Sequence, residues 1–289
     1  MNEFLQSLVG GTIAGLIYAV LGIGFNLIWG VTKVINMAHT GFALIGSYIA
    51  IILLQQAGID PLISIIFIVP FLFLLGLALH KFLIKPATKN KTLEVMLSSM
   101  VLTYGLFMII INLLVLLFKN DAKMLSPSYA DASFTFGPVS VSLLGLISVG
   151  ISLVTLAAVY IFLNHTFTGK GARAVWQNQE GAMLSGIDVD AVTSITYGVS
   201  LASAGMGGLC LAMIYSVSPY AGIVWMTYTF LVSIIGGLGS VIGTLVGGLI
   251  IGIISVTGTI IIPMNYIVTV LFTLLIIILL VRPQGLFRR

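Results

Sequence analysis

Hydrophobic runs of about 20 residues recur along the whole chain, with short polar stretches between them. A helix needs about 20 apolar residues to cross the hydrocarbon core of a bilayer, so each run predicts one membrane-spanning helix. The predicted spans cover residues 4–30, 42–57, 62–80, 93–118, 139–163, 191–214, 241–261 and 266–281. The pattern therefore predicts an all-α polytopic membrane protein with about eight transmembrane helices.

Two interruptions break the hydrophobic pattern, one in each half of the chain. The first is VINMAHTG at residues 34–41, and the second is the glycine-dense stretch at residues 236–240. Each glycine inside a helix costs about 1 kcal/mol relative to alanine. We therefore expect a break at 236–240, with residues 226–238 forming a short or re-entrant element before it.

These interruptions are candidates for a translocation path. Irregular backbone at membrane depth is tolerated only where it is buried in protein or lines a water-filled cavity, and paired helix interruptions are where transporters usually bind substrate. The candidates are the polar and glycine residues of the two breaks, namely Asn36, His39, Gly237, Gly239 and Ser240. The alternative is that Asn36 and His39 only cap helix ends at the interface.

Composition agrees with a single membrane domain over residues 1–289. The chain is 59% hydrophobic and 7% charged, with a mean hydropathy of +1.20, whereas soluble domains carry about 25% charged residues. No basic segment precedes the first run, so we expect residues 4–30 to be a retained span. The net charge of +4 suits loops that face anionic lipid, not nucleic acid. The expected location is a bacterial-type cell (inner) membrane, crossed several times.

Charge in the loops predicts the topology. Lys81, Lys85, Lys89 and Lys91 follow the third span with no acidic residue before Glu94. Loops rich in lysine and arginine stay on the cytoplasmic side, so this loop is expected inside. The segment 166–190 follows two spans later and is therefore also expected in the cytoplasm.

The segment 166–190, TFTGKGARAVWQNQEGAMLSGIDVD, is the one long polar stretch of the chain. Its pattern predicts a helix from Ala172 to Ser185 that ends at Gly186, since glycine readily takes the left-handed conformation after a helix. Asp190 is expected to cap a following helix that begins at Ala191. The plainest interpretation is a solvated connector between two spans.

The chain lacks the groups that would power transport by itself. A pump or proton-coupled carrier needs ionisable side chains in mid-membrane, but all eight acidic residues fall in loops or at span ends. Gly169 and Lys170 resemble the end of a phosphate-binding loop, yet Gly171 replaces the required serine or threonine. We predict no catalytic residue, no metal and no cofactor on this chain. Energy is expected to enter from another chain, which would dock on the polar segment.

Several motifs resemble a known family. The segment EGAMLSG at residues 180–186 resembles the E-A-A-x-x-x-G loop of ABC importer permeases, with Gly181 in place of the first alanine. The longer run RAVWQNQEGAMLSGIDVD is similar to the version in branched-chain amino-acid permeases, as are VINMAHTGFALIGSY, GGLGSVIGTLVGG and RPQGLF. The resemblance covers nearly the whole chain. The length of the chain is similar to that of the H-type subunit, one of the two permease subunits in this family. Thr40 departs from the glycine that usually follows the histidine.

The resemblance implies an importer of leucine, isoleucine and valine. It implies two cytoplasmic ABC ATPase subunits that bind ATP, a second homologous permease that completes the path, and an extracytoplasmic amino-acid-binding protein. It also implies that 166–190 carries a coupling helix, whose expected contacts with the ATPase are Arg173, Gln179, Glu180, Gly181, Ala182 and Gly186. One alternative is a permease of a related ABC importer for urea or short amides, which would share every motif. Another alternative is a stand-alone channel or secondary transporter, which would transport without ATPase subunits.

Overall fold

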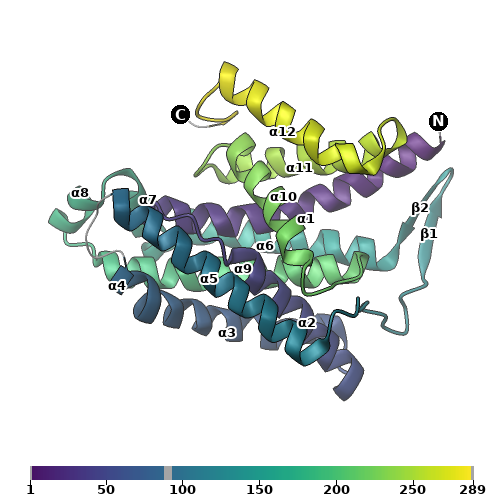
Figure 1. Ribbon diagram of the computed structural model, residues 1–289, viewed down its shortest axis with the longest axis horizontal. Coiled ribbons are helices and arrows are strands. Elements are labelled where there is room, and N and C mark those ends of the chain that lie inside the picture. Colours follow the sequence, from purple (N-terminus) through teal and green to yellow (C-terminus); the bar gives the residue numbers. More distant parts are fainter. Residues whose placement is uncertain (1, 88–92, 288–289) are drawn as a thin grey trace.

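The computed structural model describes residues 2–87 and 93–287, and these residues form a helical bundle (Figure 1). The longer helices are α1 (Asn2–Thr32), α2 (His39–Ala57), α3 (Pro61–Leu79), α5 (Leu93–Phe118), α6 (Leu143–His165), α9 (Val189–Ile214), α10 (Ala221–Gly236), α11 (Val241–Thr257) and α12 (Met264–Val281). Among the described residues, eight helical segments are long and apolar enough to cross a membrane, and α10 is shorter. The protein is a polytopic helical membrane protein, as predicted.

Several predicted elements have different bounds. The second span begins at His39 and not at residue 42, and the short element predicted at 226–238 is α10, which begins at Ala221. The third and fifth spans also differ. The third is longer than 62–80, because α3 continues through the π-helix η1 (His80–Ile84) and the short α4 (Lys85–Ala87). The fifth begins later than residue 139, because the first residues of that run form strand β2 (Val139–Ser142), which pairs antiparallel with β1 (Ser133–Phe136). The Ser142 side chain then accepts a hydrogen bond from the backbone N–H of Gly145 and begins α6.

The helices differ sharply in how much of their surface the bundle covers. In the best apolar window of each span, 89% of the residues are buried in α9 and 72% in α1, against 17% in α12. Outer helices present large apolar side chains such as Leu116 and Leu280, each 80% exposed. Because these side chains would be unfavourable in water, their surroundings are lipid or another membrane subunit.

Close packing at the centre depends on glycine. A Cβ added to Gly15 of α1 would stand 2.7 Å from the carbonyl oxygen of Gly248 in α11, and one added to Gly11 would stand 2.9 Å from that of Gly252. The four-residue spacing of glycines in both segments predicts such an approach. The backbones of α1 and α11 therefore touch directly at two points that lie about one helical turn apart.

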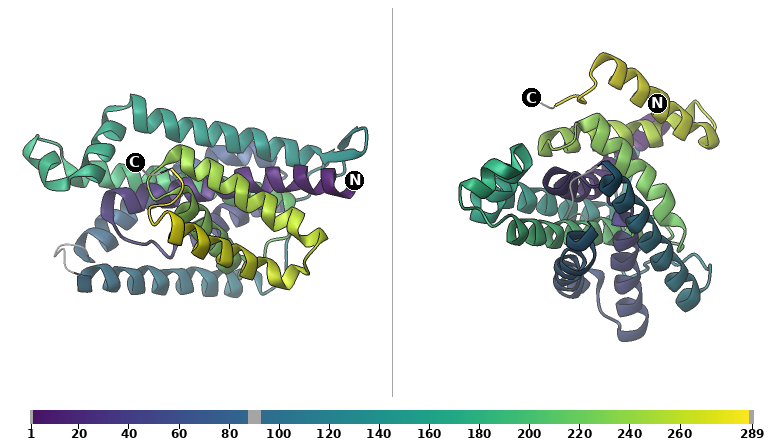
Figure 2. Two further views of the ribbon diagram at one scale, coloured as in Figure 1. Left: turned by 90° about the horizontal axis from the view of Figure 1, so that it is seen from above. Right: turned by 60° about the vertical axis from the view of Figure 1, so that its left-hand side comes forward.

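The two ends of the bundle carry different loops (Figures 1 and 2). The hairpin β1–β2 lies at one end, beside the start of α1, where the Gln6 side-chain amide exchanges two hydrogen bonds with the backbone of Ser140 at 2.7 and 2.9 Å. Two further short helices, α7 (Phe167–Gln177) and α8 (Gln179–Leu184), extend from the opposite end. Helix α1 runs from the first end toward the second.

Candidate docking loop and membrane breaks

The polar segment 166–190 folds as two helices, so the predicted single helix from Ala172 to Ser185 is wrong. Helix α7 ends at Gln177 and α8 begins at Gln179. Asn178 between them has extended backbone (φ −155°, ψ 106°), and its side chain accepts a hydrogen bond from the N–H of Gly181 at 3.0 Å. Asparagine is a good cap because its side-chain oxygen replaces the missing helical acceptor. The capping residue Asn178 thus separates α7, which packs against α6, α9 and α1, from a projecting α8.

The predicted coupling residues lie on different parts of this loop. Glu180 is exposed on α8, Gln179 is partly exposed and Ala182 is buried. Arg173 is on α7, where its guanidinium donates to the side-chain oxygen of Asn164 in α6 at 2.9 Å and braces the corner between the two helices. The structure therefore brings Gln179, Glu180, Gly181 and Ala182 together on α8, and it gives Arg173 a structural contact.

Helix α8 ends as expected and presents apolar side chains. Gly186 has a φ of +82°, the left-handed conformation predicted for the helix stop. Leu184 is 91% exposed and Met183 is 58% exposed. An exposed apolar tip beside the carboxylate of Glu180 makes α8 a candidate contact surface for another protein.

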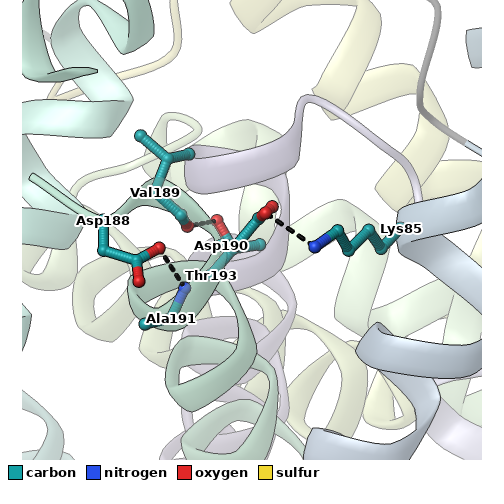
Figure 3. Close-up of polar contacts among 6 residues, drawn as sticks. All are labelled: Lys85, Asp188, Val189, Asp190, Ala191 and Thr193. Atoms are coloured by element: carbon teal, nitrogen blue, oxygen red, sulfur yellow. Dashed lines mark hydrogen bonds and ion pairs between the residues drawn. The ribbon is translucent and has the colours of Figure 1, made fainter. Parts of the chain in front are cut away.

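The connection from α8 to α9 is anchored by two neighbouring carboxylates with different tasks (Figure 3). Asp188 caps α9, since its carboxylate accepts from the N–H of Ala191 at 3.0 Å, so the prediction that Asp190 is the cap is wrong. Asp190 instead pairs with Lys85 at 2.7 Å. The pair places the loop at the same end of the bundle as the lysines that follow α3. Two of those lysines, Lys89 and Lys91, lie outside the described residues.

The first break is a buried, non-helical segment between α1 and α2, as predicted. Asn36 and Ala38 are fully buried in it. Thr103 of α5 contacts its backbone, because the hydroxyl accepts from the N–H of Met37 at 3.2 Å. The hydroxyl proton is shared between the carbonyl of Ile35 at 3.2 Å and that of Met100 in its own helix at 3.1 Å. The Asn36 side chain accepts from the N–H of Ala38 at 3.1 Å, which is a capping role. The irregular backbone is therefore held inside protein.

The start of α2 is tied to two other helices. His39 Nε2 lies 3.0 Å from the carbonyl oxygen of Leu21 in α1. A carbonyl can only accept, so this nitrogen carries the proton. The Thr40 hydroxyl donates to the carbonyl of Gly222 in α10 at 2.8 Å. Thr40, which departs from the family pattern, thus supplies a contact that glycine lacks.

The second break lies between α10 and α11, as predicted. Gly237 and Gly239 have φ angles of +94° and +99°, which side chains rarely allow. The Ser240 hydroxyl accepts from the N–H of Gly243 at 2.9 Å and begins α11. The backbone N–H of Leu286 donates to the carbonyl of Ile235 at 2.9 Å, so the segment after α12 also contacts this break.

Sequence reasoning missed Asn26 and Trp176. Asn26 lies in the C-terminal half of α1 and is only 3% exposed. Its side-chain nitrogen donates to the hydroxyl of Thr244 in α11 at 2.6 Å. Trp176 of α7 packs against Gly239. Both line a small cavity beside the second break. The sequence signal available for Asn26 was an amide residue within an apolar run, whereas no local pattern marks Trp176.

The arrangement defines a class of protein. Apolar spans, two buried helix breaks and an exposed helical loop at one end together describe a multi-pass membrane permease. The chain belongs to the family described as "Branched-chain amino acid transport system / permease component", whose model matches residues 7–281.

Curated relatives agree over nearly the full length. The permease LivH of the high-affinity branched-chain amino acid transport system of Escherichia coli K12 is 28% identical over 99% of this chain and 96% of its own. The permease BraD of Pseudomonas aeruginosa matches with the same identity and coverage. A probable LivH of Methanocaldococcus jannaschii is 30% identical over 85% of this chain and 78% of its own. No solved structure matches the chain.

Proposed function

We propose that the chain is the permease subunit of an ATP-driven importer for leucine, isoleucine and valine. The observation that carries this proposal is the loop 166–190, which projects from the end of the bundle where Asp190 pairs with Lys85. Because lysine-rich loops stay inside, this end faces the cytoplasm, where ATPase subunits are found. The substrate class follows from the family and from the names of the relatives.

The partners in this proposal are two cytoplasmic ABC ATPase subunits, a second homologous permease and an extracytoplasmic amino-acid-binding protein. Helix α8 is the docking element: Glu180 makes the polar contact, and the exposed Met183 and Leu184 fill the partner's groove. The ATPase subunits bind the ATP, and this chain contributes no catalytic residue and no cofactor of its own.

The proposed path runs along the C-terminal half of α1, between the two breaks. Asn36 and His39 lie on one side, and Gly237, Gly239 and Ser240 on the other. Backbone amides and small polar groups suit the charged ends of an amino acid, and apolar walls suit its aliphatic side chain. Variants Asn36→Ala and His39→Ala are expected to change the rate or the selectivity of uptake. If both leave uptake unaltered, Asn36 serves only its capping contact and His39 only its hydrogen bond to α1.

The decisive experiment is to purify the chain with its co-encoded partners in vesicles and to measure ATP hydrolysis with candidate ligands. Leucine, isoleucine and valine, delivered by the binding protein, are expected to stimulate hydrolysis and to be taken up. Stimulation by urea or a short amide instead would move the substrate to the related permeases for those compounds. Uptake by vesicles that lack the ATPase subunits would indicate a channel or secondary transporter.

A further inference from the structure

Trp176 connects the docking loop to two membrane segments. Its indole lies where Gly30 of α1 and Gly239 of the second break have no side chain. A Cβ added to Gly30 would stand 2.6 Å from the indole Cδ2, and one added to Gly239 would overlap the six-membered ring. The indole therefore fills two backbone notches at once, and these notches belong to segments about 200 residues apart in the sequence.

Further contacts hold the end of α7 in this place. The Lys33 ammonium, just after α1, lies 3.4 Å from the backbone carbonyl oxygen of Trp176 and 5.7 Å from the centroid of its ring. The second distance is within the range of a cation–π interaction. The small cavity beside the indole is lined by Asn26, Ser240 and Thr244 as well. The ring thus has tight contact with two backbones and free volume next to it.

These contacts are suited to transmit movement. An indole is rigid because only two torsions orient it, and a glycine has no side chain that can rotate out of the way. A displacement of α7 must therefore shift the backbone at Gly30 and Gly239 or withdraw the ring from both notches. Close-packed interiors pass displacements on in this manner, because they compress little.

We propose that Trp176 is a positioning residue that transmits displacement of the ATPase-docking loop to the break at residues 237–240. This inference rests on the proposed function. In one state of the transporter the indole occupies its two notches and holds the second break against α1. When the docked ATPase subunits pull α7 away, the ring leaves Gly239, and the break is free to move relative to α1.

The first test compares Trp176→Ala and Trp176→Phe with the wild type in vesicles that contain the complete transporter. Leucine uptake and ATP hydrolysis are measured together, because their ratio reports coupling and a merely structural role would not change it. For Trp176→Ala we expect assembly and hydrolysis to persist while uptake per ATP falls about fivefold or more, with Trp176→Phe in between. Trp225→Phe is the matched control, since Trp225 is a buried indole of α10, and its ratio is expected to stay unchanged.

The second test removes the notch instead of the ring. Gly30→Ala places a methyl group against the indole, so it is expected to lower uptake per ATP in the presence of Trp176. In the Trp176→Ala background the same change has nothing to strike and is expected to have no further effect. Gly150→Ala in α6 is the control, because a Cβ there meets no atom within 4 Å.

An assembled Trp176→Ala transporter with wild-type uptake per ATP would overturn the inference. If that variant does not assemble, Trp176→Phe and Gly30→Ala decide, and wild-type ratios in both would equally overturn it. An equal loss from Gly30→Ala with and without the indole would do the same. Failure of the wild-type complex to take up any branched-chain amino acid would instead refute the proposed function.

Discussion

At the scale of single residues, neighbouring side chains of the same type have different structural roles. Asp188 satisfies a free backbone N–H at the start of α9, whereas Asp190 pairs with Lys85 in contact with solvent. Helix caps contribute about 1 kcal/mol, and exposed ion pairs about 0–1 kcal/mol. The cap therefore matters more for stability, and the ion pair matters more for where the loop lies.

This difference predicts unequal effects of two alanine substitutions. Asp188→Ala is expected to lower the free energy of unfolding by about 1 kcal/mol, because it leaves helix N–H groups without an acceptor. Asp190→Ala is expected to lower it by less than about 0.5 kcal/mol, since both partners of its ion pair are more than half exposed. Thermal unfolding of the purified variants in detergent measures both values. A larger loss for Asp190→Ala would mean that the pair, and not the cap, anchors the loop.

A second residue-scale prediction concerns Glu180. It is exposed on α8, so Glu180→Lys is expected to leave the fold and the melting temperature of the chain unchanged. The reversed charge is expected to uncouple transport, and leucine uptake per ATP would fall about tenfold if one charged contact to the ATPase is lost. The measurement is uptake and hydrolysis in vesicles, with Glu180→Gln as the milder control. Normal ATP-driven uptake by the lysine variant would remove α8 as the docking element.

At the scale of elements, the first break is supported from outside itself. A single hydroxyl of α5, from Thr103, pairs with two backbone groups of the unwound segment. Buried backbone groups that lose their partners cost about 1–3 kcal/mol each. The break therefore depends on where α5 lies.

Thr103→Val is accordingly expected to destabilise the protein by about 1–3 kcal/mol and to slow uptake, because valine has nearly the same shape but no hydroxyl. Thr273→Val in α12 is the control. The Thr273 hydroxyl bonds only to a carbonyl one turn earlier in its own helix, and the residue is exposed. Unfolding in denaturant and uptake rates would test the pair, and equal effects of the two variants would contradict the role given to Thr103.

The elements that sequence predicted well are those set by local composition. Long apolar runs indicated the spans, and dense glycines at 236–240 indicated the second break, because both depend on propensity over a few residues. The hairpin β1–β2 was missed because its second strand continues directly into an apolar run. The split at Asn178 was missed because asparagine is compatible with either a helix interior or a cap, and tertiary packing decides between them.

The candidate site was predictable to a lesser degree. The residues of α8 were predicted as ATPase contacts because a motif marks them, and this stays a prediction. Gly186 was predicted as the helix stop, and its left-handed backbone confirms that. Trp176 carries no such mark, since its importance comes from Gly30 and Gly239, which lie far from it in the chain. Contacts of that kind are set by the packing of whole helices, which local patterns do not contain.

At the scale of the whole molecule, the structure has an end with the hairpin β1–β2 and an opposite end with α7 and α8 of the loop 166–190 (Figure 1). Phe136 is 67% exposed on the hairpin, and Leu184 is 91% exposed on α8. If the lysine-bearing end is cytoplasmic, these two side chains lie on opposite sides of the membrane.

Cysteine labelling tests this topology directly. The native Cys210 is buried, and its replacement by serine gives a background without reactive thiols. In that background, Phe136→Cys is expected to react with a membrane-impermeant maleimide added to intact cells. Leu184→Cys is expected to react only in inside-out vesicles stripped of peripheral subunits. Labelling of Leu184→Cys from outside would invert the topology and remove the docking role of the loop.

The glycine contact between α1 and α11 has a consequence for how the transporter can move. Side-chain interfaces slide when rotamers change, but the contact between Gly15 and Gly248 is backbone against backbone and has no rotamers to change. We therefore expect the two helices to move together as one rigid unit. We expect the hinges at the margins of this pair, in residues 34–38 and 237–240, where the chain leaves α1 and enters α11 in non-helical backbone.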